Sequence, residues 1–262
     1  MAVRRQYSRR RLLGAAGAAI SGLAGRLAMP RLVFAQNKKA VHFTLPWVAE
    51  GSNLFIFVAK GMGYWEKHEL DVDIARGSGS VAAAQAIGEA RFDFAMCSPS
   101  AAILQATKGL PTVALAACAY DATMGIGMLI DGSIKSPKDL EGRQLASTVT
   151  SGEYPFLQAF AENAGFDLAK VTRVQVDNKV RDRLLSEGKV DAISGYASSA
   201  MPTYVATGVK ARFMLFSDFG LLNYGTAVMR RNGSLRSPNY ALRLWTGRCK
   251  ASRRRCSIPP RR

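Results

Sequence analysis

The run LDVDIARGSGSVAAAQAIGE, which begins at Leu70, combines a predicted strand, a glycine–serine turn and a predicted helix. Glycine lets the backbone turn sharply. The first N–H groups of a helix lack partners within it, so they favour an anion or another strong acceptor. No Lys or Thr completes a phosphate loop, and GSGS differs from the dinucleotide pattern GxGxxG. The turn therefore predicts a polar contact at Ser78, Gly79 and Ser80, with simple capping by Ser80 as the alternative.

Similar junctions between strand and helix recur along the chain and define a set of candidate ligand-binding residues. Predicted strands and helices alternate in two series, from residue 40 to 119 and from 125 to 216. This order predicts an α/β fold of two lobes with parallel strands and right-handed crossovers. Ligands of such sheets lie beyond the carboxyl ends of the strands. The candidates are Trp47, Glu50, Asn53, Ser78, Gly79, Ser80, Cys97, Ser98, Ser100, Thr148, Ser151, Tyr154, Tyr196 and Tyr224.

Each candidate has a structural interpretation beside the functional one. Trp47 could stack on a planar ring or pack in the core. Glu50 and Asn53 could exchange hydrogen bonds with a ring amine, or act as a loop acid and a helix cap. Tyr154 could close over a ring or begin the apolar face of its helix, whereas capping alone would explain Ser98. The aromatic junctions favour a planar heterocycle as ligand.

Basic residues are scarce at these junctions. Arg181 and Arg183 lie two apart on a predicted helix and are expected to be solvated surface charges. Nitrate and sulfonates require a cation or many N–H donors. The junctions therefore disfavour these anions.

The net charge of +17 would suggest a nucleic-acid or membrane partner, but the charge is unevenly distributed. Residues 1–35 hold 7 Arg and residues 230–262 hold 11 Lys and Arg, without any acid in either segment. Residues 36–229 hold 18 basic and 19 acidic residues, a net charge of −1. The body of the chain is thus nearly neutral, and no nucleic-acid partner is expected.

Both basic ends have explanations of their own. Residues 1–35 are expected to be a signal peptide, because SRRRLL precedes an apolar run and Val33-Phe34-Ala35 forms a cleavage site. The SRRxLL pattern resembles a twin-arginine signal, although general export machinery would also accept it. Cleavage near Ala35 would place the protein in the periplasm. The acid-free segment 231–262 is expected to be an atypical tail, from a truncated or aberrant C-terminus.

The histidines and cysteines do not form a catalytic or metal-binding pattern. Cys97 and Cys118 each end an apolar run and are expected to be buried thiols, although export would permit a disulfide between them. His42 and His68 have no evident acid–base partner. We therefore expect no metal, no cofactor and no enzymatic activity.

Several separated blocks resemble the NMT1/THI5-like family in the family's own order. These blocks are FTLPW, AKGMGYWEKHELDVDIARGSGS, FDFAMCSPSAAILQATKGLPTVALAA, SPKDLEGRQLA and LLSEGKVDAISGY. The resemblance covers residues 40–229 and implies a type II periplasmic binding protein-like fold with a hinge. It implies the domain order 36–127 for lobe I, 128–223 for lobe II and 224–230 for a return hinge strand.

The resemblance also implies a function. Such proteins capture a small ligand for an ABC importer and deliver it to the membrane permease and its ATPase subunits. Pyrimidine thiamine precursors, sulfonates, taurine and nitrate are ligands in such families. Ligand would shift the lobes about hinge strands near 125–130 and 224–229. The alternative is a pyrimidine-precursor synthase-like enzyme of the same family, but its cysteine-rich CCCFC motif is absent and only Cys97 occupies the comparable region.

Overall fold

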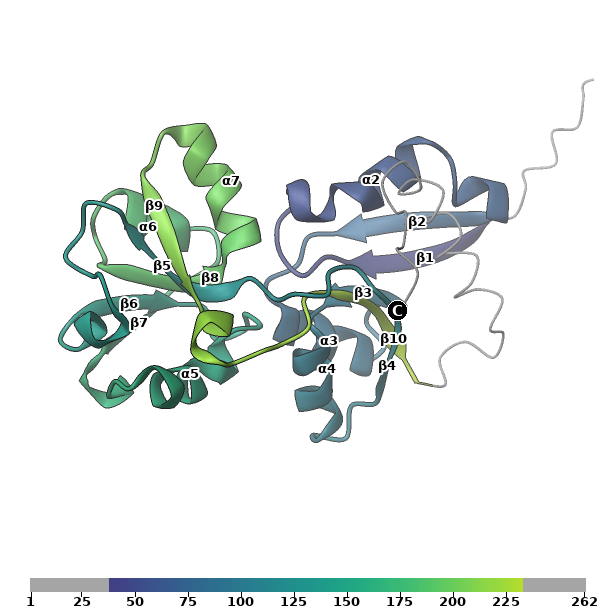
Figure 1. The fold of residues 1–262 in the computed structure, drawn as a ribbon. Coiled ribbons are helices and arrows are strands. Elements are labelled where there is room, and N and C mark those ends of the chain that lie inside the picture. The colour runs from purple at the N-terminus through teal and green to yellow at the C-terminus, as the bar shows by residue number, and fades with distance from the viewer. Residues whose placement is uncertain (1–37, 233–262) are drawn as a thin grey trace, which may run out of the picture. The chain divides into compact units, whose positions relative to one another are not determined.

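The computed structural model describes residues 38–232 (Figure 1). The expected signal peptide and all but the first two residues of the expected tail lie outside these residues. The described chain forms two five-stranded sheets, each with its own helices. We call the first sheet and its helices lobe I, and the second sheet and its helices lobe II.

Lobe I has the strand order β2-β1-β3-β10-β4. The strands are β1 (Lys39–Thr44), β2 (Leu70–Ala75), β3 (Phe94–Cys97), β4 (Thr112–Ala117) and β10 (Ala227–Arg231). Strand β1 pairs in parallel with β2 and β3, as the alternation of strand and helix predicts. Strand β10 returns from lobe II and pairs antiparallel with both β3 and β4.

Helices cover both faces of the lobe I sheet. Helix α2 (Leu54–Gly61) packs Ile56 and Ala59 against Val41 and Phe43 on one face. Helices α3 (Ser80–Gly88) and α4 (Pro99–Ala106) cover the other face with small side chains, such as Ala84. Alanine-rich helices approach a sheet closely, and their N-termini meet the carboxyl ends of the strands.

Lobe II has the strand order β7-β6-β8-β5-β9. The strands are β5 (Met124–Leu129), β6 (Gln144–Ser147), β7 (Thr172–Gln175), β8 (Ala192–Tyr196) and β9 (Ala211–Leu215). The helices are α5 (Leu157–Ala164), α6 (Arg181–Ser186) and α7 (Ala197–Thr207). Phe160 stacks on Phe216 at 4.4 Å between ring centroids in the main core. No helix within residues 38–232 has the length and apolarity to cross a bilayer.

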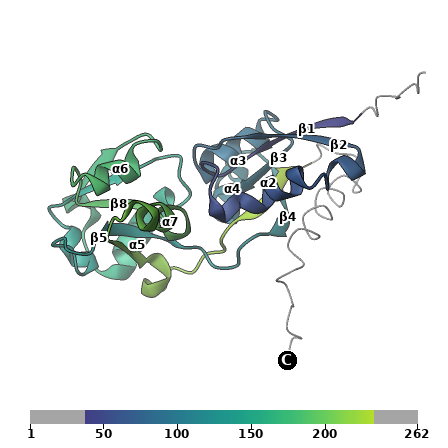
Figure 2. The ribbon, with the colours of Figure 1, turned by 90° about the horizontal axis from the view of Figure 1, so that it is seen from above.

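Two segments, 118–123 and 220–226, connect the lobes and run side by side (Figure 2). Their backbones are hydrogen-bonded: Cys118 N–H donates to Thr226 O at 2.6 Å, and Ala122 N–H donates to Asn223 O at 3.1 Å. The expected hinge strand 125–130 is instead β5, which is paired on both edges within lobe II. The expected boundary between residues 127 and 128 falls inside β5, so the crossing lies before that strand.

Candidate functional site

A cavity of about 270 Å³ lies between the lobes and the crossing segments. Lobe I contributes Pro46, Trp47, Glu50, Ser52, Ser80 and Met96. Lobe II contributes Ser151, Arg181, Tyr196, Ser198 and Ser199. The crossing segments contribute Cys118, Ala119, Asp121, Thr123, Gly225 and Thr226. Enclosure by both lobes would remove a small ligand from water.

One wall of the cavity is a stack of Trp47 and Arg181. Trp47 follows β1, Arg181 is the first residue of α6, and the guanidinium carbon lies 4.7 Å from the ring centroid. Arg181 is 1% exposed, so the expectation that it is a solvated surface charge is wrong. The indole face replaces part of the hydration that the buried guanidinium has lost. Arg183 is exposed and pairs with Glu187.

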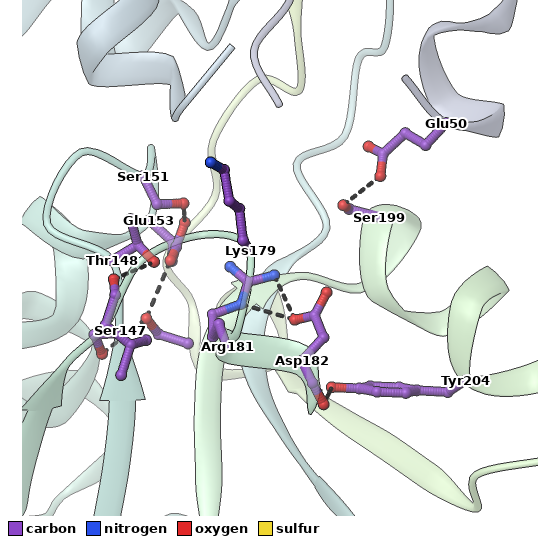
Figure 3. A network of polar contacts seen from close by, with 12 residues as sticks. Glu50, Ser147, Thr148, Ser151, Glu153, Lys179, Arg181, Asp182, Ser199 and Tyr204 are labelled. Atoms are coloured by element: carbon purple, nitrogen blue, oxygen red, sulfur yellow. Dashed lines mark hydrogen bonds and ion pairs between the residues drawn. The ribbon is translucent and has the colours of Figure 1, made fainter. Parts of the chain in front are cut away.

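Two carboxylates, half-buried Asp182 and fully buried Glu153, neutralise the charge of Arg181 (Figure 3). Its Nε and Nη2 atoms both donate to Asp182 Oδ1 at 2.8 Å. Burial by itself would lower the pKa of Arg181, but Asp182 and Glu153 outweigh it and raise the pKa. The guanidinium therefore stays charged while its charge is already matched within lobe II.

Glu153 anchors a buried network beneath the cavity (Figure 3). Ser151 donates a short hydrogen bond to Glu153, and Ser194 lies 3.0 Å from the same carboxylate. Ser194 also lies 2.9 Å from the hydroxyl of Ser147, at the end of β6. A fully buried carboxylate is tolerated only with such partners. The network fixes the loop that carries Ser151 to the cavity wall.

Glu50 reaches from lobe I to lobe II. Asn53, which is completely buried, holds its loop by accepting from Glu50 N–H at 3.0 Å and donating to Val48 O at 2.8 Å. Ser199 of α7 donates to Glu50 Oε2 at 2.6 Å, and Ser52 donates to Oε1 at 2.8 Å. Burial raises the pKa of Glu50, and the two serine hydrogen bonds partly oppose this shift.

The N-terminus of α3 contacts lobe II. Val81 N–H donates to Thr150 O at 3.0 Å, and Thr150 Oγ1 donates to Ser78 O at 2.5 Å. Gly79 has φ of 131°, and a side chain there would collide with the Thr150 carbonyl. The polar acceptor at this helix end is thus a backbone group of the other lobe.

The structure brings five of the fourteen candidates to the cavity wall: Trp47, Glu50, Ser80, Ser151 and Tyr196. Asn53 and Ser98 support that wall from behind, because Asn53 fixes the Glu50 loop and Ser98 N–H donates to Ser80 Oγ at 3.2 Å. Ser98 also caps α4 by accepting from Ala101 N–H.

The remaining candidates lie elsewhere. Gly79 contacts the backbone of Thr150. Ser78 and Thr148 line a separate groove, which lies between the turn before α3 and lobe II. Tyr154 borders a depression beside β7, and Ser100 and Tyr224 border a groove by the crossing segments. Tyr224 is 67% exposed.

The two described cysteines are free thiols. Cys97 is fully buried, and burial raises its pKa to about 12. Strand β10 lies between β3, which ends at Cys97, and β4, which Cys118 follows. Two strand spacings amount to about 10 Å, whereas a disulfide needs Cα atoms within about 7 Å. The sheet order thus explains why no disulfide joins Cys97 to Cys118.

Sequence reasoning missed Arg181, Ser199 and Asp121. Arg181 and Ser199 lie inside the first turn of α6 and α7, just beyond the loops that the junction rule selects. Asp121 lies on a crossing segment, which sequence assigned to no junction. If the search for ligand contacts at strand-to-helix junctions were extended into the first turn of each helix, it would include Arg181 and Ser199.

The lobed α/β architecture is the type II periplasmic binding protein fold. Among solved structures, the alkanesulfonate-binding protein SsuA of Xanthomonas axonopodis pv. citri, bound to MOPS, has a TM-score of 0.65 at 11% identity, covering 81% of this chain and 73% of that one. The periplasmic aliphatic sulphonate-binding protein SsuA of Escherichia coli has a TM-score of 0.64 at 14% identity, covering 82% and 74%. These similarities establish the fold.

Residues 52–237 match the family described as NMT1/THI5 like, and the chain belongs to this family. A formylaminopyrimidine-binding protein of Halalkalibacterium halodurans is 25% identical over 195 residues, 74% of this chain. The chain spans 59% of the length of that relative.

Proposed function

We propose that the chain acts as the solute-binding component of an ABC importer and holds a small organic ligand in the cavity between its lobes. Family membership and the type II fold support this role. The observation that carries it is the cavity itself, which takes polar groups from both lobes. A ligand that bridges Glu50 of lobe I and Ser151 of lobe II would favour the state in which both lobes contact it.

The walls of the cavity support a planar heterocycle of the pyrimidine type over a sulfonate, taurine or nitrate. Trp47, which carries Arg181 on one ring face, lines the cavity, and Tyr196 adds a second ring at the end of β8. Arg181, the basic residue of the cavity wall within residues 38–232, is already paired with Asp182. An oxyanion would have to compete with that carboxylate.

The protein would be exported by twin-arginine or general export machinery and would deliver its ligand in the periplasm to the permease and ATPase subunits. It would bind its ligand without converting it. In residues 38–232, His42 and His68 lie on β1 and beside β2, away from the cavity wall.

A thermal-shift panel tests the proposal. The purified chain is heated with 4-amino-5-hydroxymethyl-2-methylpyrimidine, its formylamino counterpart, thiamine, taurine, butanesulfonate or nitrate. A ligand that binds only the folded state adds about 2.7 kcal/mol of stability at a hundredfold excess over Kd. We expect a shift with the pyrimidines. A shift with anions alone would reject the heterocycle, and no shift with any compound would reject the proposed binding role.

A further inference from the structure

Glu50 is an acid of the cavity wall that both lobes hold in a fixed position. Asn53 fixes its backbone from lobe I, and Ser199 donates to its carboxylate from lobe II. Each carboxylate oxygen has two lone-pair sites, so the hydrogen bonds from Ser199 and Ser52 leave acceptor capacity on both oxygens. The side chain is thus oriented and still able to accept further donors.

The charges around the cavity leave Glu50 without a balancing cation. Among residues 38–232, Arg181 is committed to Asp182 and lies near Glu153, and Glu50 forms no ion pair. Asp121 adds a second carboxylate from the crossing segment. Lys179, visible in Figure 3, is exposed and is not part of the cavity wall. The cavity therefore has surplus negative charge and hydrogen-bond acceptors.

Tyr196 adds an aromatic ring to the cavity wall at the end of β8. Its hydroxyl is buried beside Ser80 and Ser98. Burial raises the pKa of Tyr196, and hydrogen bonding with the two serines partly opposes this shift. The ring, and not the hydroxyl, is therefore the part of Tyr196 that a flat ligand would meet.

We infer that Glu50 is the specificity-determining residue of the cavity and selects flat nitrogen compounds that present an N–H donor edge. This inference rests on the proposed binding function and narrows its ligand class. Such a compound, neutral or protonated, would donate to Glu50, with its flat ring against the wall that includes Trp47 and Tyr196. An oxyanion would instead meet an unpaired carboxylate, which is a repulsive contact.

Isothermal titration calorimetry of three proteins with matched probes tests this role. The probes are 4-amino-5-hydroxymethyl-2-methylpyrimidine, its analogue without the 4-amino group, and butanesulfonate. For wild type, we expect removal of the amino group to weaken binding about tenfold or more, since hydrogen bonds to charged groups are strong. Glu50→Gln should lose about the same factor for the amino compound and little for its analogue. Glu66→Gln, an exposed glutamate of lobe I, serves as the matched control.

The Ser199→Ala variant distinguishes ligand selection by the Glu50 carboxylate from the effect of the hydrogen bond between the lobes. It removes the hydrogen bond across the lobes and keeps the carboxylate, so both pyrimidines should weaken by a similar factor. Wild type that binds both pyrimidines equally, or a Glu50→Gln protein with unchanged preference, would overturn the role of Glu50 alone. Wild type that prefers butanesulfonate would overturn the ligand class. Binding of none of the probes would overturn the proposed function, and with it this inference. A single cooperative melting transition confirms that each variant is folded.

Discussion

Arg181 carries a buried positive charge that is surrounded by two carboxylates and an indole ring. Asp182 accepts hydrogen bonds from two nitrogen atoms of the guanidinium, and Glu153 lies near the same group. Trp47 covers one face of the guanidinium. Such a pair adds little stability compared with apolar side chains, but its disruption leaves uncompensated charge in the interior. Arg181 is therefore best understood as a fixed part of the wall that orients Trp47.

Replacement of Arg181 by methionine should be strongly destabilising. The change keeps much of the side-chain volume but leaves Asp182 and Glu153 without their cation, so the free energy of unfolding should fall by about 3–5 kcal/mol. Urea unfolding measures this loss. The double variant Arg181→Met with Glu153→Gln should recover part of it. A single variant as stable as wild type would show that the buried pair is unimportant.

Glu50 should make the stability of the ligand-free protein depend on pH. Burial raises its pKa above the ordinary value of 4.5, so folding favours the protonated form. Its favourable contribution is then present below about pH 4.5 and is lost as the pH rises through the raised pKa. The charged groups facing it are Arg181 and Asp182 of α6, with Asp121 on the crossing segment.

Glu50→Gln should consequently melt above wild type at pH 7–8, because it removes a buried charge. The difference in Tm should shrink toward pH 4, where the wild-type carboxyl becomes neutral. Scanning calorimetry across this range measures it. A difference that stays constant with pH would mean that ionisation of Glu50 does not limit stability.

The contact between the 148–152 loop and the N-terminus of α3 depends on small residues. Gly152 lies against the hydroxyl of Tyr196, and a Cβ there would also come within 3.0 Å of Ser80 Cβ and Ser98 Oγ. Thr150 meanwhile accepts the hydrogen bond from Val81 N–H. The two backbones approach closely because no side chain separates them.

Gly152→Ala should separate this loop from lobe I and also crowd Tyr196. Overpacking of this kind costs about 1–3 kcal/mol, and ligand affinity should fall because Ser151 and Tyr196 move. Gly61→Ala is the control, since its Cβ meets nothing within 4 Å near the end of α2. Urea unfolding and calorimetric titration measure both effects. Equal behaviour of the two variants would argue against close packing at Gly152.

Local sequence pattern was sufficient to predict most of the elements, but not all of their neighbours. Alternating strands and helices predicted the two α/β lobes, and the junction rule selected Trp47, Glu50 and Tyr196, which lie on the cavity wall. Insertion of β10 between β3 and β4 joins residues more than a hundred positions apart, which no local period records. The burial of Arg181 depends on Trp47 of the other lobe, so spacing on one helix could not reveal it.

Backbone hydrogen bonds join the two crossing segments to each other and lobe I to lobe II. The paired amides of these segments and the contact of Val81 with Thr150 are backbone hydrogen bonds that link regions far apart in the sequence. Ligand in the cavity should strengthen all of them together, because each bond needs the same arrangement of lobes. Central amides of β1 and β5 are already paired within their own sheets.

Hydrogen–deuterium exchange should reveal this dependence. Addition of 4-amino-5-hydroxymethyl-2-methylpyrimidine should slow exchange in peptides containing Val81, Ala122 and Gly225, and should leave peptides from β1 unchanged. Mass spectrometry of digested peptides provides the measurement, with the ligand-free protein as the reference. Protection confined to one lobe would contradict coupling through the cavity.

We expect a small nitrogen compound to occupy the cavity between the lobes. A crystal structure of the full chain grown with 4-amino-5-hydroxymethyl-2-methylpyrimidine tests it most directly. We expect density for the pyrimidine beside Trp47, with its amino group within hydrogen-bonding distance of Glu50. Ligand in the groove beside Tyr224, or an empty cavity at saturating concentration, would contradict this expectation.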